Sequence, residues 1–284
     1  MFSIIINTTG RSIYLRHTLD SLARQKYQDF ELIVVLNGCD SDSRANKITE
    51  MLDRKQFSYK LFRVGGLVPL GHARSIGISL VSRDRIIFLD DDDIFEVNHL
   101  DLIASSLLKN DSDIIVSGFK VIEGDDQVVE RKCCELTDRK LEEFLSGDER
   151  SVINYPFGLG AVCFRRDVFS RIDFNRRKTF IVDFELMFEA IRYFRFSVAN
   201  TCTFQYRINL VGLSSQKKNL YREELLDFVE RKFPFEWSYM RLVLFGFVFS
   251  RHFDVGQLLL NPRVAISIGC FSFFRIIERV VKFK

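Results

Sequence analysis

The chain has 284 residues, of which 47% are hydrophobic and 28% are charged. This composition is that of an ordinary globular protein, and it excludes an intrinsically disordered chain or a protein with many membrane spans. The 41 basic and 38 acidic residues leave a net charge of only +3, which is too small for a dedicated nucleic-acid binder. The six cysteines show no Cys-x-x-Cys spacing, so we expect reduced thiols in a cytoplasmic protein.

Along the chain, apolar runs of strand length alternate with segments whose apolar residues recur at helical spacing. This alternation is typical of β-α-β units and predicts an α/β fold, with a mainly parallel sheet flanked by helices. We expect strands at residues 2–6, 30–36, 59–64, 85–89, 113–119, 161–164 and 203–207. We expect helices at residues 13–26, 48–52, 72–81, 100–108, 137–147 and 180–194, and a loop or hairpin at 123–131. Only helical periodicity continues beyond residue 218, which predicts one domain at 1–218 and a helical extension at 219–284.

Four adjacent aspartates, Asp90 to Asp93, follow directly on the apolar strand at 85–89. Ligands of open α/β sheets bind beyond the carboxyl ends of strands, and adjacent negative charges repel one another unless a cation neutralises them. Residues two apart on an extended segment point to the same side, so we expect Asp90 and Asp92 to face one divalent cation together. The alternative is a solvated acidic turn that precedes the next helix.

Four motifs occur in the order and at the spacing seen in the family 2 glycosyltransferases of GT-A fold, and the chain before residue 218 therefore resembles that family. They are Ile6-Asn7-Thr8-Thr9-Gly10-Arg11, Leu36-Asn37-Gly38-Cys39, Gly71-His72-Ala73-Arg74-Ser75-Ile76-Gly77 and Phe88-Leu89-Asp90-Asp91-Asp92-Asp93. The resemblance implies a Rossmann-like GT-A sheet, a metal-binding Asp-x-Asp motif and an inverting transfer of a sugar from a nucleotide-sugar.

The resemblance also implies a role for each matching residue. Asp92 is expected to ligate Mg²⁺ or Mn²⁺, and Asp90 is expected to contact the ribose or the metal shell. The metal would bridge the donor diphosphate and neutralise the charge on the leaving nucleotide. A UDP-sugar is the expected donor, although Leu36-Asn37 replaces the Asp-Asp pair with which the family reads uracil. The further contacts to the nucleotide-sugar are expected from Thr8, Arg11, Asn37, Arg74 and Asp91.

Inverting sugar transfer needs a carboxylate that takes the proton of the acceptor hydroxyl, and the helix expected at 180–194 carries Asp183 and Glu185. Residues two apart lie on nearly opposite sides of a helix. Asp183 heads the apolar stripe, whereas Glu185 heads a charged stripe with Glu189 and Arg192; we therefore expect Asp183 to face inward and Glu185 to face solvent. The helix resembles the family's Glu-Asp-x-x-Leu-x-x-Arg element, which implies that Asp183 is the catalytic base. The alternative is an Asp183 that only stabilises the helix N-terminus.

Residues 237–284 combine aromatic and aliphatic side chains with Arg and Lys. The uninterrupted apolar runs are shorter than the roughly 20 residues of a spanning helix, so we expect this extension to lie on a membrane surface. The alternative is that it completes the core or a dimer interface. Before it, Tyr206-Arg207-Ile208-Asn209 to Ser214 resembles the family segment that closes over the donor, with Asn209 in place of a possible metal-binding His.

These features predict a metal-dependent inverting glycosyltransferase that acts on a glycan or a lipid-linked glycan in cell-surface polysaccharide synthesis. It would work in the cytoplasm or on the inner face of the cell membrane, without a nucleic-acid partner. Two other classes remain open. One is a degenerate domain of the same fold that binds glycans or proteins. The other is a sugar nucleotidyltransferase, which usually carries a Gly-rich phosphate loop after its first strand.

Overall fold

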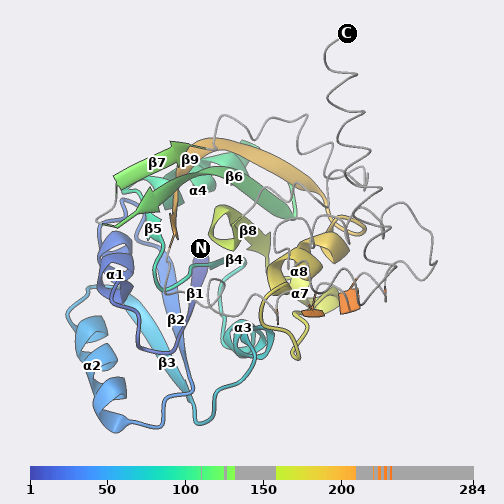
Figure 1. Ribbon diagram of the computed structural model, residues 1–284. Helices are drawn as coiled ribbons and strands as arrows, with labels where there is room; N and C mark the ends of the chain where they lie inside the picture. Colours follow the sequence, from blue (N-terminus) through green and yellow to red (C-terminus); the bar gives the residue numbers. More distant parts are fainter. Residues whose placement is uncertain are drawn as a thin grey trace.

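The computed structural model in Figure 1 describes residues 1–109, 111–124, 127–131 and 158–208, together with six helical residues of a C-terminal segment. These six are Leu220, Glu223, Glu224, Asp227, Phe228 and Arg231. The helix expected at 137–147, the segment at 209–214, the predicted boundary at 218 and the extension at 237–284 lie outside the described residues.

A nine-stranded mixed sheet runs through the centre of the described part (Figure 1), with the strand order β3-β2-β1-β4-β8-β6-β9-β5 and β7 paired with β6. Its first strands in the chain are β1 (Phe2–Thr8), β2 (Phe30–Asn37), β3 (Ser58–Val64), β4 (Arg85–Phe88) and β5 (Ile94–Phe95). The later strands are β6 (Ile114–Glu123), β7 (Gln127–Arg131), β8 (Val162–Arg165) and β9 (Phe196–Ile208). The helices are α1 (Leu15–Ala23), α2 (Asp42–Asp53), α3 (Leu70–Ser79), α4 (His99–Lys109), α7 (Val168–Arg171) and α8 (Val182–Ala190), with a 3-10 turn η2 (Leu159–Ala161).

Strand direction divides the sheet into two parts. Strands β3, β2, β1 and β4 are parallel to one another. Strand β8 is antiparallel to both β4 and β6, whereas β6 and β9 are parallel. The expectation of a mainly parallel sheet with flanking helices therefore holds for the N-terminal half, and the carboxyl ends of β1, β2 and β4 meet at one edge.

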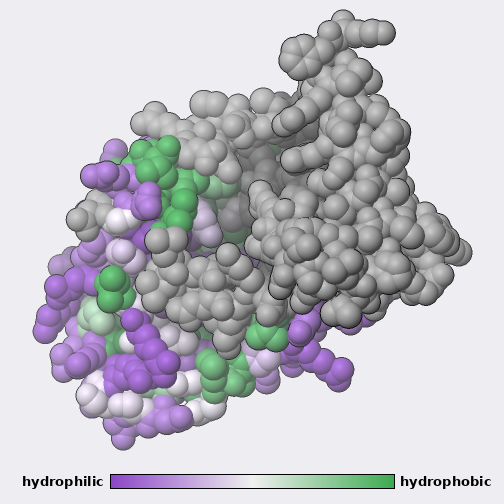
Figure 2. All heavy atoms as spheres, viewed as in Figure 1, coloured by the Kyte–Doolittle hydropathy of each residue, from purple (hydrophilic) through white to green (hydrophobic). Residues whose placement is uncertain are grey.

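Alternating side chains of the central strands supply two hydrophobic cores, one on each face of the sheet. Ile4 and Ile6 of β1 pack with α1, α2 and α4, whereas Ile5 packs with α3, α7 and α8. All eight residues of β2 are buried, which confirms that this strand is covered on both faces. On the face shown in Figure 2, the described surface is mostly hydrophilic, and its hydrophobic residues include one contiguous group near the top of the view. Within the described residues, no helix has both the length and the hydrophobicity needed to cross a membrane.

Some element bounds differ from those expected. The helix expected at 180–194 ends at Ala190, and the strand expected at 203–207 begins already at Phe196, where β9 starts to pair with β6. The two-residue strand β5 was not expected, because two residues show no periodicity; it forms by pairing with β9. In the segment expected as a loop or hairpin, Gln127–Arg131 pairs antiparallel with the end of β6, which gives a β6–β7 hairpin, one of the two forms expected there.

Candidate active site

The four aspartates form a tight turn between β4 and β5, at the carboxyl edge of the parallel strands. The Asp93 N–H donates a hydrogen bond to the Asp90 carbonyl oxygen (3.2 Å). The expectation that Asp90 and Asp92 lie on an extended segment is therefore wrong, because β4 ends at Phe88 and the chain reverses at once. The carboxylates of Asp90, Asp91 and Asp93 have different protein partners.

Two of these carboxylates are tied to the protein itself. The Thr8 hydroxyl, at the end of β1, donates a hydrogen bond to the Asp91 carboxylate, and the Ser12 hydroxyl donates to the Asp91 carbonyl oxygen (3.0 Å). The buried Asp93 carboxylate accepts the backbone N–H of Arg207 (2.8 Å). The turn is therefore held from β1, from the loop after it and from β9, which differs from a loosely solvated acidic turn.

Burial, reinforced by neighbouring negative charge, raises the pKa of two carboxyl groups in this turn. Burial, opposed by the Thr8 hydrogen bond and reinforced by Asp92 and Asp90, raises the pKa of Asp91 to about 7. Burial together with the charges of Asp90 and Asp92 raises the pKa of Asp93 well above its usual range. The turn thus holds more negative potential than its surroundings neutralise, and a divalent cation with oxygen ligands would relieve it.

Arg207 of β9 contacts the acidic turn and two neighbouring segments. Its side chain is 2% exposed; Nε donates to the Asp92 carbonyl oxygen (2.8 Å) and Nη1 donates to the Gly124 carbonyl oxygen (2.6 Å). Its guanidinium also lies 4.2 Å from the centre of the Tyr14 ring. Arg207 therefore joins the acidic turn, the β6–β7 hairpin and the loop after β1, and these contacts are to the protein rather than to a ligand.

Arg74 of α3 connects the acidic turn with the candidate base. Its buried guanidinium contacts the Asp90 carboxylate through Nη2 (3.3 Å) and the Asp183 carboxylate through Nη1. The rings of Phe88 and Phe174 lie 5.8 and 5.4 Å from the same guanidinium. Asp183 is in the first turn of α8, and its side chain is 30% exposed. The sequence-predicted residues Arg74, Asp90 and Asp183 are thus brought together.

A short loop before α8 fits closely against α3 and sets the distance between Arg74 and Asp183. The Gly71 N–H donates to the Lys178 carbonyl oxygen (3.0 Å), and the Ser75 hydroxyl donates to the Asp173 carboxylate (2.9 Å). A Cβ on Gly71 would lie 2.1 Å from the Asn175 carbonyl oxygen. Only glycine therefore fits at position 71 without a shift of the backbone.

Two other predicted nucleotide contacts lie in the loops around this edge. The Asn37 amide, at the end of β2, donates to the Val68 carbonyl oxygen (2.8 Å) and accepts the Val68 N–H (2.9 Å). This reciprocal pair fixes the loop that leads into α3. Arg11 is exposed in the loop after β1, next to Gly10 with its positive φ of 69°.

The expectation that Glu185 faces solvent is wrong. Its side chain is 11% exposed, and its carboxylate accepts hydrogen bonds from Arg231 (2.9 Å) and from Asn175 (3.3 Å). The C-terminal segment covers this side of α8, which the local helical pattern could not indicate. The roles of Arg207 and Asp93 were missed for the same reason, because their partners are far away in the sequence.

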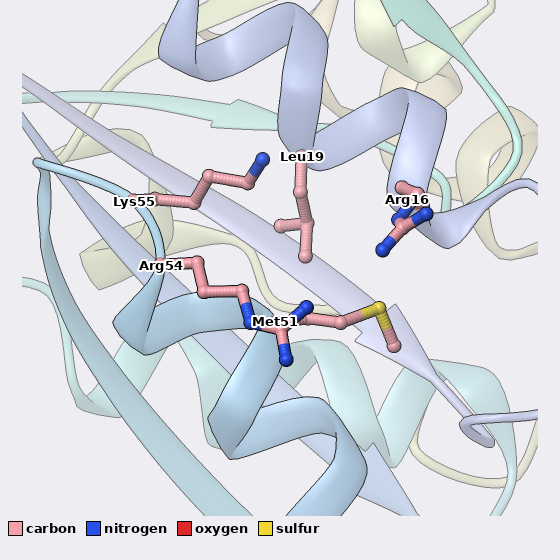
Figure 3. Close-up of a pocket in the computed structure, with 5 residues that line it drawn as sticks. All are labelled: Arg16, Leu19, Met51, Arg54 and Lys55. Atoms are coloured by element: carbon pink, nitrogen blue, oxygen red, sulfur yellow. The ribbon is translucent and has the colours of Figure 1, made fainter.

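A small hollow lies between α1 and α2 and is separate from these residues. It has a volume of about 30 Å³, room for about one water molecule. Figure 3 shows its lining, and none of the predicted site residues belongs to it. The lining residues are Arg16, Leu19, Met51, Arg54 and Lys55.

Residues 3–173, more than half of the chain, match the sequence model of Glycosyl transferase family 2. The chain belongs to glycosyl transferase family 2. It is 28% identical over 122 residues to the Escherichia coli UDP-Glc:alpha-D-GlcNAc-diphosphoundecaprenol beta-1,3-glucosyltransferase WfgD, a match covering 43% of this chain and 47% of that protein. It is 27% identical over 124 residues to the Escherichia coli O-antigen biosynthesis glycosyltransferase WbnJ, with the same two coverages. The chain thus spans about half the length of these curated relatives.

Solved structures share the fold of this family 2 chain. Staphylococcus aureus TarS 1–349, solved in complex with UDP-GlcNAc, superposes with a TM-score of 0.64 at 17% identity, covering 95% of this chain and 80% of that one. The mannosyltransferase PcManGT from Pyrobaculum calidifontis, solved with GDP-Man and Mn²⁺, gives a TM-score of 0.60 at 12% identity, covering 100% and 80%. These likenesses confirm the expected GT-A fold.

Proposed function

We propose that this chain is a metal-dependent inverting glycosyltransferase that moves a sugar from a nucleotide-sugar to a hydroxyl of a glycan or lipid-linked glycan. The observation that carries the proposal is the double contact of Arg74 with Asp90 and Asp183. It sets a partly exposed carboxylate beside the acidic turn, so that a donor and an acceptor hydroxyl can meet between them.

At the donor side, Asp90 and Asp92 would hold a Mg²⁺ or Mn²⁺ ion. Such ions commonly take one or two protein carboxylates and complete their shell with substrate phosphates and water. Among the described residues, no group of three or more His, Cys, Asp or Glu side chains is placed to hold a metal ion, so most of the ion's shell would be left to substrate phosphates and water. Burial, with a smaller contribution from the charges of Asp92 and Asp90, raises the pKa of Asp91, and a cation bound beside these carboxylates would oppose the charge contribution. When bound, the ion supplies Lewis-acid stabilisation of the leaving nucleoside diphosphate.

The remaining donor contacts are proposed from the loops at the same edge. Thr8 and Asp91, which are joined by a hydrogen bond, would form one side of the nucleotide-sugar site. Asn37 acts by fixing the loop before α3, and the exposed Arg11 can reach a phosphate or a base. A UDP-sugar is the first donor to test, since the names of the relative WfgD and of the TarS complex contain UDP-Glc and UDP-GlcNAc. A GDP-sugar is the second donor to test, because the PcManGT structure was solved with GDP-Man.

At the acceptor side, Asp183 would take the hydroxyl proton as the acceptor oxygen attacks the anomeric carbon. Its Oδ1 is buried and lies against Arg74, while the side chain as a whole is 30% exposed. We therefore assign Oδ2 as the oxygen that accepts the proton. Arg74 fixes the direction of the Asp183 carboxylate.

The names of two relatives support a proposal for the acceptor and the location. The name of WfgD gives an acceptor joined to diphosphoundecaprenol, and WbnJ is named for O-antigen biosynthesis. We infer a lipid-linked glycan acceptor in cell-surface polysaccharide synthesis, met in the cytoplasm at the inner face of the membrane. The aromatic and basic extension at 237–284 would bring the chain to that surface.

A nucleotide panel and one base variant test this proposal. UDP, GDP, CDP and dTDP are added with and without Mn²⁺ in thermal unfolding of the wild type and of Asp92→Asn. One nucleotide is expected to raise the Tm only with Mn²⁺, by an amount that Asp92→Asn removes. Asp183→Asn should keep this rise and lose sugar transfer by about 100-fold or more. Asp101→Asn is the matched control, since Asp101 is an exposed acid in the first turn of α4.

Two results would reject this function. A chain that no nucleotide stabilises in the presence of Mn²⁺ has no donor site, which favours the degenerate binding domain. Transfer that survives unchanged in Asp183→Asn removes Asp183 as the base. A sugar nucleotidyltransferase would instead form a nucleotide-sugar from a nucleoside triphosphate, and the same preparation can be assayed for that product.

A further inference from the structure

A C-terminal segment packs against the start of α8, next to the candidate base. Its six described residues have helical backbone. Those that contact α8 or the loop before it recur every three or four residues, which places them on one face of a helix. They are Glu224, Asp227, Phe228 and Arg231.

Glu224 receives three consecutive backbone N–H groups. Oε1 accepts the N–H of Thr179 (2.8 Å), and Oε2 accepts those of Phe180 (2.7 Å) and Ile181 (3.2 Å). N–H groups at the start of a helix have no acceptor within the helix. A capping side chain usually supplies one, but the N-cap residue Ile181 makes no such bond. Glu224 accepts the N–H of the N-cap residue Ile181 and those of the two residues before it, and so holds the chain that enters α8. These hydrogen bonds are charge-assisted and therefore stronger than neutral ones.

The rest of the same face holds the segment in place. The fully buried Phe228 ring packs edge-on against Phe184 and Phe188 of α8, with ring centres 5.1 and 5.2 Å apart. Arg231 pairs with the buried Glu185 (2.9 Å). Hydrophobic burial and an ion pair on one helix face therefore anchor Glu224 against α8.

A second anchor links the segment to α3. The Lys178 ammonium group pairs with the Asp227 carboxylate (2.6 Å). The Lys178 carbonyl oxygen accepts the Gly71 N–H at the start of α3, the helix that carries Arg74. The loop before α8 is therefore bound both to α3 and to the C-terminal segment.

We propose that Glu224 is a positioning residue for Asp183, and that the C-terminal segment thereby forms part of the acceptor half of the active site. Asp183 follows two residues after Ile181, so the three hydrogen bonds to Glu224 fix the backbone from which it projects. Displacement of a reacting group by about 1 Å can cost about 100-fold in rate. This inference rests on the proposed function of Asp183 as the base.

The test compares Glu224→Gln with Glu223→Gln in the full chain. Glutamine has nearly the same size, but its amide group presents N–H donors toward the N–H groups of residues 179–181. Glu223 is the exposed neighbour, so its variant makes the same charge change away from α8. Glu224→Gln is expected to lower kcat about 10- to 100-fold with little change in the donor KM or in the Mn²⁺-dependent rise of Tm with nucleotide. Glu224→Asp, which keeps the carboxylate, should recover part of kcat.

Amide hydrogen exchange at residues 179–181 provides a readout that does not need catalysis. Exchange should be faster in Glu224→Gln and unchanged in Glu223→Gln. An active wild type with equal kcat and equal exchange in Glu224→Gln would overturn the proposal, as would an equal loss of kcat in Glu223→Gln. If Glu224→Gln does not fold, Glu224→Asp carries the same comparison. A wild type without transfer activity rejects the proposed function instead, and faster exchange in Glu224→Gln would then show the contact without a catalytic role.

Discussion

The guanidinium of Arg74 on α3 contacts the carboxylate of Asp183 on α8, and this ion pair joins the two sides of the candidate active site. The same guanidinium contacts Asp90 of the acidic turn. A planar fork with several N–H donors can serve two carboxylates at once, which a lysine ammonium group does less well. A single buried cation thus sets the geometry between the proposed metal site and the proposed base.

Arg74→Gln should therefore lower both stability and activity. Loss of one partner of a buried ion pair costs about 3–5 kcal/mol, and we expect about 3 kcal/mol because Asp90 and Asp183 are partly exposed. Urea unfolding measures this loss. Arg74→Lys should recover part of the stability but little of the transfer activity, because the two contacts need the fork. Equal activity in Arg74→Lys and the wild type would contradict this account.

Gly71→Ala should be destabilised by about 1–3 kcal/mol, the usual cost of forcing extra atoms into a packed site. Its Cβ would meet the Asn175 carbonyl oxygen at 2.1 Å, so the loop before α8 must move. Gly65→Ala is the matched control, because a Cβ there has nothing within 4 Å. Thermal unfolding of the two variants checks the prediction, and equal Tm values would refute it.

Arg207→Gln should lower the affinity for nucleotide, although Arg207 itself is not proposed to contact the nucleotide. It removes the charged donor to the Asp92 and Gly124 carbonyl oxygens, and so loosens the turn that presents Asp90 and Asp92. We expect the Mn²⁺-dependent rise of Tm with nucleotide to shrink, and the nucleotide Kd to increase by about tenfold or more. Arg177→Gln, at an exposed arginine, should bind nucleotide as the wild type does. An unchanged nucleotide Kd in Arg207→Gln would show that the acidic turn keeps its shape without the Arg207 side chain.

His99 should make the protein sensitive to acid. Complete burial lowers its pKa to about 3, and the ring packs on Phe95 (4.0 Å between centres) with Nδ1 2.8 Å from the Thr203 hydroxyl. The unfolded chain binds a proton near pH 6.5, so the contribution of His99 to stability is fully present above pH 6.5 and is lost as the pH falls toward 3. At pH 5 this loss is about 2 kcal/mol relative to pH 7.5.

The check is urea unfolding at pH 7.5 and at pH 5. His99→Gln should show a smaller difference between the two pH values than the wild type, whereas His17→Gln, at an exposed histidine, should keep the full difference. An acid dependence that persists unchanged in His99→Gln would assign it to other groups.

Local patterns predicted the parts of the fold that depend on local burial. The continuous apolar run of β2 was recognised as a strand covered on both faces, and the apolar spacing in α1 was recognised as a helix. The family resemblance also implied that Asp90 and Asp183 belong to one site, and Arg74 contacts both of them. Tertiary contacts decided the rest. Glu185, for example, is buried and pairs with Arg231 of the C-terminal segment and with Asn175 of the loop before α8. A charged helix face has the same sequence pattern whether water or another segment covers it.

The geometry of the acidic turn was beyond prediction for a related reason. Strand pairing of β5 with β9 and the hydrogen bond from the Arg207 N–H to Asp93 bend the chain after Phe88. These partners come from distant parts of the sequence, and one sequence does not show which distant segments meet. The types of residue in the site could be recognised, but the directions of their side chains could not.

Residues late in the sequence contact the candidate site residues that come early in the sequence, and this order matters during synthesis on the ribosome. Thr8, Arg74 and the acidic turn emerge with the parallel strands, whereas Arg207 and Glu224 emerge only after β9. Domains begin to fold from the N-terminus while translation continues. The parallel half can therefore form on the nascent chain, but the proposed donor and acceptor sites are completed only at a late stage. A truncated translation product would carry the motifs of the family without a working centre.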